Sequence, residues 1–163
     1  MKYGTRAPTC GSLDGGWQLN TISTFQTGLP FTPTMATSAL NNGNWQLPNR
    51  TCEGSLPNDQ RGPSRWFDTG CFVSPGAFIY GNSGTNILRG PGLITIDLAM
   101  MKNFPLPFRD GMRIQFRAEA FNIANRANFR LPNFNIGVPA SATINNTLTG
   151  FGRQIQMVVK VEF

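Results

Sequence analysis

The side chains that carry most enzyme chemistry are sparse in this sequence. It contains no histidine, the residue that most often serves as a general base or metal ligand near neutral pH. Asp68 lies close before Cys71, but a nucleophilic thiol needs a basic partner, so a structural cysteine is the better interpretation. The aspartates do not have the spacing of a calcium-binding loop; they are Asp59, Asp68, Asp97 and Asp110. We therefore expect no enzyme activity, no metal ion and no cofactor.

The three cysteines indicate structure rather than chemistry. Cys10, Cys52 and Cys71 show no CxxC spacing, which argues against a zinc site. Cys52 and Cys71 fall in one loop-like region and form a candidate disulfide in an oxidising compartment. Sequence alone leaves this connectivity open.

The net positive charge alone is weak evidence for a nucleic-acid or anionic lipid partner. The 14 Lys and Arg against 8 Asp and Glu give a net charge of +6, but the basic residues are dispersed, as on an ordinary surface. Phe116, Arg117 and Phe121 could stack bases, yet Phe116 and Arg117 point to opposite faces of a strand. The glycine-rich stretches "GNSGTN" and "RGPG" precede no helix that would hold phosphate. We expect no nucleic-acid partner.

The composition favours short strands joined by long polar loops. Only 13% of the 163 residues are charged, and 18 Gly, 12 Pro and 13 Phe are present. No apolar run approaches the roughly 18 residues of a membrane-spanning helix. Alternation with a period of two predicts four strands, near residues 17–27, 93–104, 112–123 and 153–163. The third, "MRIQFRAEAFN", is rich in helix formers, but its strict alternation favours a strand.

Each predicted strand has one apolar and one polar face. In the last strand the apolar positions are Met157, Val159, Val161 and Phe163. Polar side chains fall on the other faces, which we expect to face the lumen of a barrel; they are Asp97, Arg113, Gln115, Arg117, Glu119 and Lys160. The spacing of Arg117 and Glu119 suits ion pairs with a neighbouring strand better than catalysis. Lys102 and Arg153 fall on the apolar side, where we expect them to reach polar surroundings from the strand ends.

Alternation alone fits a soluble β-sandwich as well as a membrane barrel, but two features favour lipid. Trp17 and Phe25 share a face and lie about 26 Å apart along an extended strand. This separation is close to the roughly 25 Å apolar band that aromatic girdles flank in outer-membrane barrels, so we expect both at the membrane interfaces. In addition, the connections 28–91 and 125–150 are long, whereas the connection between the second and third predicted strands is short. Alternation of long and short connections is typical of such barrels.

Four segments resemble the C-terminal end of TonB-dependent receptors, in particular the Oar-like group with carboxypeptidase-regulatory-like N-terminal domains. They are "GWQLNTISTFQTGLPFTP", "RWFDTGCFVSPGAFIYGNSGTNILRGPGLITIDLAMMKNF", "RIQFRAEAFNIANRANF" and "GFGRQIQMVVKVEF". The resemblance covers about 16–163. It implies an outer-membrane barrel of about 22 strands with a plugged lumen, which takes up a ligand with energy passed through TonB. It also implies that Phe163, Val161, Val159 and Met157 form the signal read by the barrel assembly machinery.

The expected fold is therefore all-β, an antiparallel up-and-down meander of about four strands with long loops, and an incomplete segment of an outer-membrane β-barrel. The turn near Asp110 and Gly111 is expected on the periplasmic side, and loops 28–91 and 125–150 outside the cell. Residues 1–15 are expected to be an irregular periplasmic turn or a truncation edge. Expected partners are outer-membrane lipid, the remaining barrel and plug, the barrel assembly machinery, and TonB through a missing N-terminal part. The alternative is a soluble secreted β-sandwich that binds carbohydrate or another surface through aromatic loops.

Overall fold

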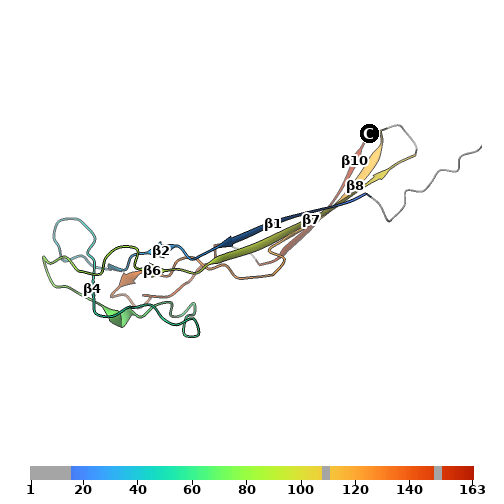
Figure 1. The fold of residues 1–163 in the computed structure, drawn as a ribbon. Coiled ribbons are helices and arrows are strands. Elements are labelled where there is room, and N and C mark those ends of the chain that lie inside the picture. The colour runs from blue at the N-terminus through green and yellow to red at the C-terminus, as the bar shows by residue number, and fades with distance from the viewer. Residues whose placement is uncertain (1–15, 108–110, 149–151) are drawn as a thin grey trace, which may run out of the picture. The chain divides into compact units, whose positions relative to one another are not determined.

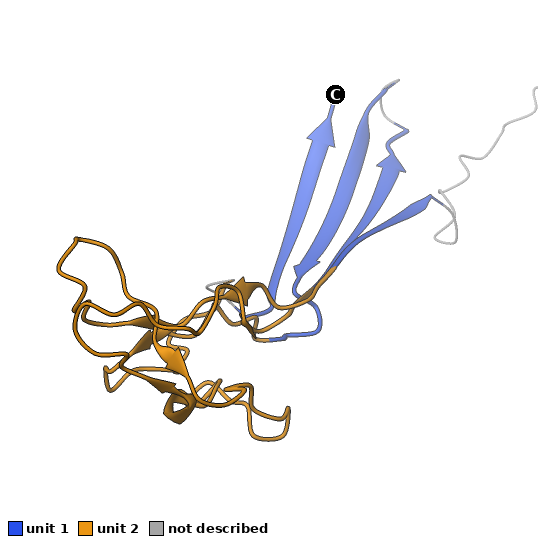
Figure 2. Ribbon diagram, turned by 60° about the vertical axis from the view of Figure 1, so that its left-hand side comes forward, with its two compact units in different colours: residues 1–24, 95–126, 151–163 blue, residues 25–94, 127–150 orange. Residues whose placement is uncertain are grey.

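A computed structural model of the chain describes residues 16–107, 111–148 and 152–163. The expectations for residues 1–15, for Cys10 and for Asp110 lie outside these residues. The described residues divide into two compact units. Figure 2 shows both units. Among the described residues, unit 1 comprises 16–24, 95–107, 111–126 and 152–163, and unit 2 comprises 25–94 and 127–148.

Four long strands form the main sheet. They are β1 (Trp17–Gln26), β7 (Leu93–Pro105), β8 (Arg113–Phe121) and β10 (Gln154–Glu162), in the order β1-β7-β8-β10 (Figure 1). β7 pairs antiparallel with β8, and β8 pairs antiparallel with β10. The predicted all-β, antiparallel fold with four strands and long loops is confirmed, and the third segment is a strand rather than a helix.

The register brings the short turn and the C-terminal end of β10 to one end of the sheet. Pro105 of β7 and Glu162 of β10 both pair with Arg113, the first residue of β8. At the turn, Leu106 donates its N–H to the carbonyl of Met112 at 2.9 Å. Gly111 adopts a φ of +87°, a conformation that costs glycine little because it has no Cβ. Both long connections therefore leave the sheet at its other end.

Unit 2 is built from the two long connections together. Its described residues form three two-stranded sheets and one short 3₁₀ helix. The strands are β2 (Pro30–Phe31) with β6 (Leu88–Arg89), β3 (Thr34–Met35) with β9 (Asn135–Ile136), and β4 (Asn49–Arg50) with β5 (Phe72–Val73); the helix is η1 (Thr69–Cys71). The pairing of β3 with β9 is parallel and joins the first connection to the second. The long connections thus fold as one body rather than as separate loops.

An aromatic cluster forms the core of unit 2. Phe67 is 1% exposed, and its ring centroid lies 5.6 Å from that of Phe31 and 5.9 Å from that of Phe72. Burying aromatic side chains supplies much apolar area for a small body.

Asn128, which is fully buried, binds the backbone of Ile94 through both its amide oxygen and its amide nitrogen. This asparagine thereby satisfies backbone groups where a strand partner is lacking.

No helix formed by the described residues is both long and apolar enough to cross a membrane.

Candidate functional site, the two faces of the four-stranded sheet

One face of the sheet is apolar because the register aligns the apolar positions of three strands. In an antiparallel ladder, paired residues share a face. The rows on this face, from β7 through β8 to β10, are Leu98–Ala120–Ile155, Met100–Ala118–Met157, Lys102–Phe116–Val159 and Phe104–Ile114–Val161. We call these rows the apolar face.

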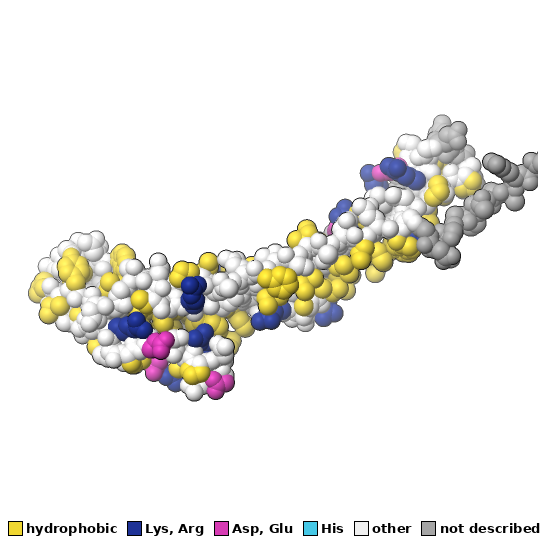
Figure 3. All heavy atoms as spheres, in the orientation of Figure 1, with side chains coloured by type: hydrophobic (Ala, Val, Ile, Leu, Met, Phe, Trp, Pro, Cys, Tyr) yellow, Lys and Arg dark blue, Asp and Glu magenta, His cyan; other side chains and the backbone are white. Residues whose placement is uncertain are grey.

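Nothing in the described chain covers the apolar face on β10. Met157 is 71% exposed and Val159 is 64% exposed. Every residue of β1 is exposed as well. Hydrophobic side chains form a continuous stretch along the sheet in the space-filling view (Figure 3). Exposed apolar surface of this extent marks a surface that contacts something other than water.

Lys102 is the exception on the apolar face, and its environment differs from the expected one. We expected its side chain to reach polar surroundings from the strand end, but the residue is only 3% exposed to solvent. The Lys102 Nζ lies 4.8 Å from the ring centroid of Trp17 and 5.2 Å from that of Phe104. Aromatic rings stabilise a cation at such distances. This arrangement also places Trp17 at the turn end of the sheet, on the apolar face.

The opposite face carries ion pairs between and along the strands. Its rows are Ala99–Glu119–Gln156, Met101–Arg117–Val158, Asn103–Gln115–Lys160 and Pro105–Arg113–Glu162. We call these rows the polar face. Glu162 forms salt bridges with Arg113 and, at 2.8 Å, with Lys160. Glu119 forms a salt bridge with Arg117 and accepts a hydrogen bond from Gln156.

The remaining predicted polar residues also have partners on this face. Gln115 donates to the Oδ1 of Asn103 at 3.0 Å, across the β7–β8 pair.

Two apolar residues on the polar face flank Arg117. Val158 of β10 pairs with Arg117 on one side, and Met101 of β7 pairs with it on the other. The aliphatic stem of an arginine packs well between such neighbours, which accounts for both apolar residues on a polar face.

Asp97 has a structural role at the loop end of the sheet. Its Oδ1 accepts a hydrogen bond from the backbone N–H of Asn122 at 2.8 Å. Asn122 has a φ of 49° and binds both backbone groups of Arg126 through its side chain. Asn125, with a φ of 50°, accepts from the N–H of Arg153. Asparagine tolerates the left-handed conformation, so this cluster ends β8 and starts β10. The sequence analysis did not predict this cluster. The signal that could have indicated it is the pair Asn122 and Asn125, which directly follows β8.

Comparison with known proteins identifies the architecture to which these faces belong. The family model described as "Outer membrane beta barrel domain" matches residues 2–156. The chain belongs to this family. It is therefore an outer-membrane barrel protein, located in the outer membrane. No curated protein and no solved structure matches it.

The aromatic residues expected at the membrane interfaces are exposed in this outer-membrane barrel protein. Trp17, at the start of β1, is 49% exposed, and Phe25, near the end of the same strand, is 69% exposed. Aromatic side chains suit the boundary between headgroups and hydrocarbon. Phe163, which the resemblance assigns to the assembly signal, follows β10 and is 93% exposed.

In unit 2 of this barrel protein, Cys52 and Cys71 form a disulfide bond. Cys71 belongs to the aromatic core and is 5% exposed, and Cys52 lies on the surface. The bond therefore ties an outer segment to the core of unit 2.

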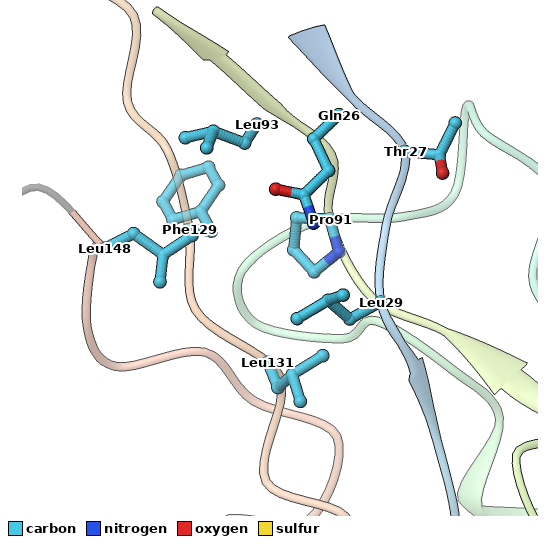
Figure 4. Close-up of a pocket in the computed structure, with 8 residues that line it drawn as sticks. All are labelled: Gln26, Thr27, Leu29, Pro91, Leu93, Phe129, Leu131 and Leu148. Atoms are coloured by element: carbon cyan, nitrogen blue, oxygen red, sulfur yellow. The ribbon is translucent and has the colours of Figure 1, made fainter. Parts of the chain in front are cut away.

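Two hollows in the described part of unit 2 differ in size and openness. A cavity of about 60 Å³ is lined by four leucines, Pro91, Phe129 and the side chains of Gln26 and Thr27 (Figure 4). Small-molecule sites measure about 300 to 1,000 Å³, so this cavity is too small. A shallow, open depression of about 330 Å³ lies over Phe129 and residues 144–147. Among the described residues, no group of His, Cys, Asp or Glu is arranged to hold a metal ion.

Proposed function

We propose that the chain forms part of the barrel wall of a TonB-dependent receptor that takes up a ligand across the outer membrane. The observation that carries this proposal is the division of the main sheet into an exposed apolar face and an ion-paired polar face. In a barrel of this kind the apolar face contacts lipid and the polar face lines the lumen. On this proposal Asp97, Arg113, Gln115, Arg117, Glu119 and Lys160 face the lumen.

The open edges of the sheet support its incorporation into a larger barrel. β1 and β10 each have a neighbour on one side only within the described chain. Even small barrels require about eight strands, and an unpaired edge exposes backbone groups that seek partners. The proposal therefore requires further wall strands beside β1 and β10.

The assignment to TonB-dependent receptors comes from the resemblance of four segments to the Oar-like group. On this proposal the short turn is periplasmic, unit 2 is extracellular, and Phe163, Val161, Val159 and Met157 are read by the barrel assembly machinery. A plug domain and a TonB-contacting segment belong to the same receptor. The chain's contribution is structural, without catalysis, cofactor or nucleic-acid partner.

The soluble β-sandwich receives no support from the geometry. A sandwich needs a second sheet over the apolar face, and the described chain leaves Met157, Val159 and Phe163 exposed. Membership of an outer-membrane barrel family argues in the same direction.

The proposal is tested by isolating the native protein from outer membranes and identifying what is joined to it. An antibody raised against unit 2 is used to isolate the protein from formaldehyde-treated outer membranes, and the captured polypeptides are identified by mass spectrometry. We expect plug-domain peptides in the same polypeptide as unit 2, and TonB crosslinked to it. A native product that contains no plug domain and captures no TonB would contradict the receptor assignment while leaving the barrel membership intact.

A further inference from the structure

Two adjacent surface segments of unit 2 present aromatic rings and amide groups to solvent. Residues 41–45 and 77–80 are exposed throughout. The exposed fractions are 62% for Trp45, 72% for Phe78, 55% for Ile79 and 68% for Tyr80. Isolated exposed apolar residues are common, but a group of four on two joined loops indicates an interaction surface. We call these two segments the aromatic loops.

A buried glutamine joins the aromatic loops. Gln46 is 1% exposed, and its amide nitrogen donates to the carbonyls of Gly76 at 2.9 Å and Ile79 at 2.8 Å. Its amide oxygen accepts from the N–H of Ala39 at 3.0 Å. The side chain thus fixes the segment that carries Phe78 to the segment that carries Trp45. Such preorganisation lowers the entropic cost of binding.

Further contacts fix the position of individual residues in the aromatic loops. Asn42 donates from Nδ2 to the hydroxyl oxygen of Tyr80 at 3.0 Å, and the Phe78 N–H donates to the carbonyl of Ala39 at 2.9 Å. Gly81 allows the two segments to approach closely, because a Cβ there would lie 2.1 Å from the Leu47 carbonyl oxygen. Phe78 itself has a φ of 61°, which is unusual for a bulky residue and is maintained by these contacts.

The chemistry of this surface selects an uncharged, hydroxyl-rich ligand. Residues 35–49 and 74–86 contain no Asp, Glu, Lys or Arg, so these two segments offer no charged group to a phosphate, a carboxylate or an ammonium group. The exposed amides of Asn41, Asn42 and Asn44 offer both donors and acceptors, as hydroxyl groups require. The aromatic rings offer flat apolar faces beside them.

We propose that the aromatic loops bind neutral oligosaccharides, with the rings of Trp45, Phe78 and Tyr80 stacking on sugar rings and the asparagine amides bonding their hydroxyls. This inference rests on unit 2 alone and does not require TonB-dependent transport. An anionic polysaccharide would pair with basic side chains, which residues 35–49 and 74–86 lack.

The test uses the whole chain, reconstituted in detergent micelles, on an array of immobilised neutral and anionic oligosaccharides. The neutral set contains oligomers of glucose, galactose, mannose, xylose and N-acetylglucosamine, and the anionic set contains oligogalacturonate and alginate oligomers. Titration of any hit in solution gives its Kd. We expect binding to at least one neutral oligosaccharide and none to the anionic set.

Variants locate the site. Trp45→Ala and Tyr80→Ala should each weaken binding about two- to tenfold, the range given by loss of one aromatic contact. Tyr80→Phe keeps the ring but loses the bond to Asn42, so its loss should be smaller. Val73→Ala removes a 43% exposed apolar residue elsewhere in unit 2 and should leave Kd unchanged. Retention of a protease-resistant unit 2 core shows that each variant is folded. The proposal is overturned if no neutral oligosaccharide binds, if anionic ones bind equally well, or if the alanine variants bind as the parent does.

Discussion

The ammonium group of Lys102 lies 4.8 Å from the centroid of the Trp17 ring, on the sheet face that otherwise carries apolar side chains. A cation–π contact of this kind contributes about 0.5 to 2 kcal/mol, more when water is excluded. Trp17 therefore lies at the turn end of the apolar face and covers the charge of Lys102.

Replacing Trp17 tests this shielding. Trp17→Leu keeps an apolar side chain but removes the ring, and we expect it to lower the free energy of unfolding in phospholipid vesicles by about 0.5 to 2 kcal/mol. In a Lys102→Met background the same replacement should cost much less, since no charge needs cover. Urea titration of the four proteins gives the coupling, and a coupling near zero would show that the contact has no energetic role.

Neighbouring positions on β10 distinguish the two faces. Met157 lies in a middle row of the apolar face, and Gln156 lies opposite Glu119 on the polar face. Met157→Arg should destabilise the protein in vesicles by about 2 to 4 kcal/mol, because it places a charge against lipid. Gln156→Arg should be tolerated, because the new cation meets a carboxylate. Equal effects of the two substitutions would contradict the assignment of the faces.

Phe163 provides a test of the assembly signal. Phe163→Ala should reduce the amount of native protein in the outer membrane severalfold, although a residue that is 93% exposed makes few contacts within the chain. Heat-modifiable migration of extracted membranes measures the assembled fraction. Gln154→Ala, at the other end of the same strand, is the control and should assemble normally. If both variants assemble equally well, Phe163 has no part in recognition.

The Cys52–Cys71 disulfide should stabilise unit 2 specifically. The cysteines are 19 residues apart, and closing a loop of about this length stabilises a fold by about 3 kcal/mol. The double variant Cys52→Ala, Cys71→Ala should expose unit 2 to limited proteolysis while the main sheet keeps its strand signal in circular dichroism. Cys10→Ala should be silent. Unchanged protease resistance of unit 2 in the double variant would show that the aromatic core suffices.

The main sheet could be predicted from sequence because its information is local. Alternation fixes the two faces of each strand, so a correct strand assignment for residues 112–123 also placed Arg117 and Glu119 on one face. The register then follows from keeping apolar rows together. The apolar exception Val158 was visible in the sequence, but its reason, the position opposite Arg117, required the pairing.

Unit 2 could not be predicted because its contacts are distant in sequence. The parallel bridge between Thr34 and Asn135, and the links from Gln46 to Gly76 and Ile79, join segments with no shared periodicity. Short two-residue strands give no alternation to read. The environment of Lys102 was missed for a related reason, since the position of Trp17 beside it depends on how β1 aligns with β7.

The central claim is that every second side chain of β10 contacts hydrocarbon. The direct measurement attaches a nitroxide label to single cysteines introduced in turn at positions 154 to 161, in a Cys10→Ser background that keeps the native disulfide, with the protein in phospholipid vesicles. We predict that labels at 155, 157, 159 and 161 are relaxed by oxygen, which partitions into lipid, and that labels at 154, 156 and 160 are relaxed by a water-soluble nickel complex. Contact of β10 with hydrocarbon is contradicted if the odd-numbered labels are shielded from both reagents, or if the protein remains in water as a compact monomer with these side chains buried.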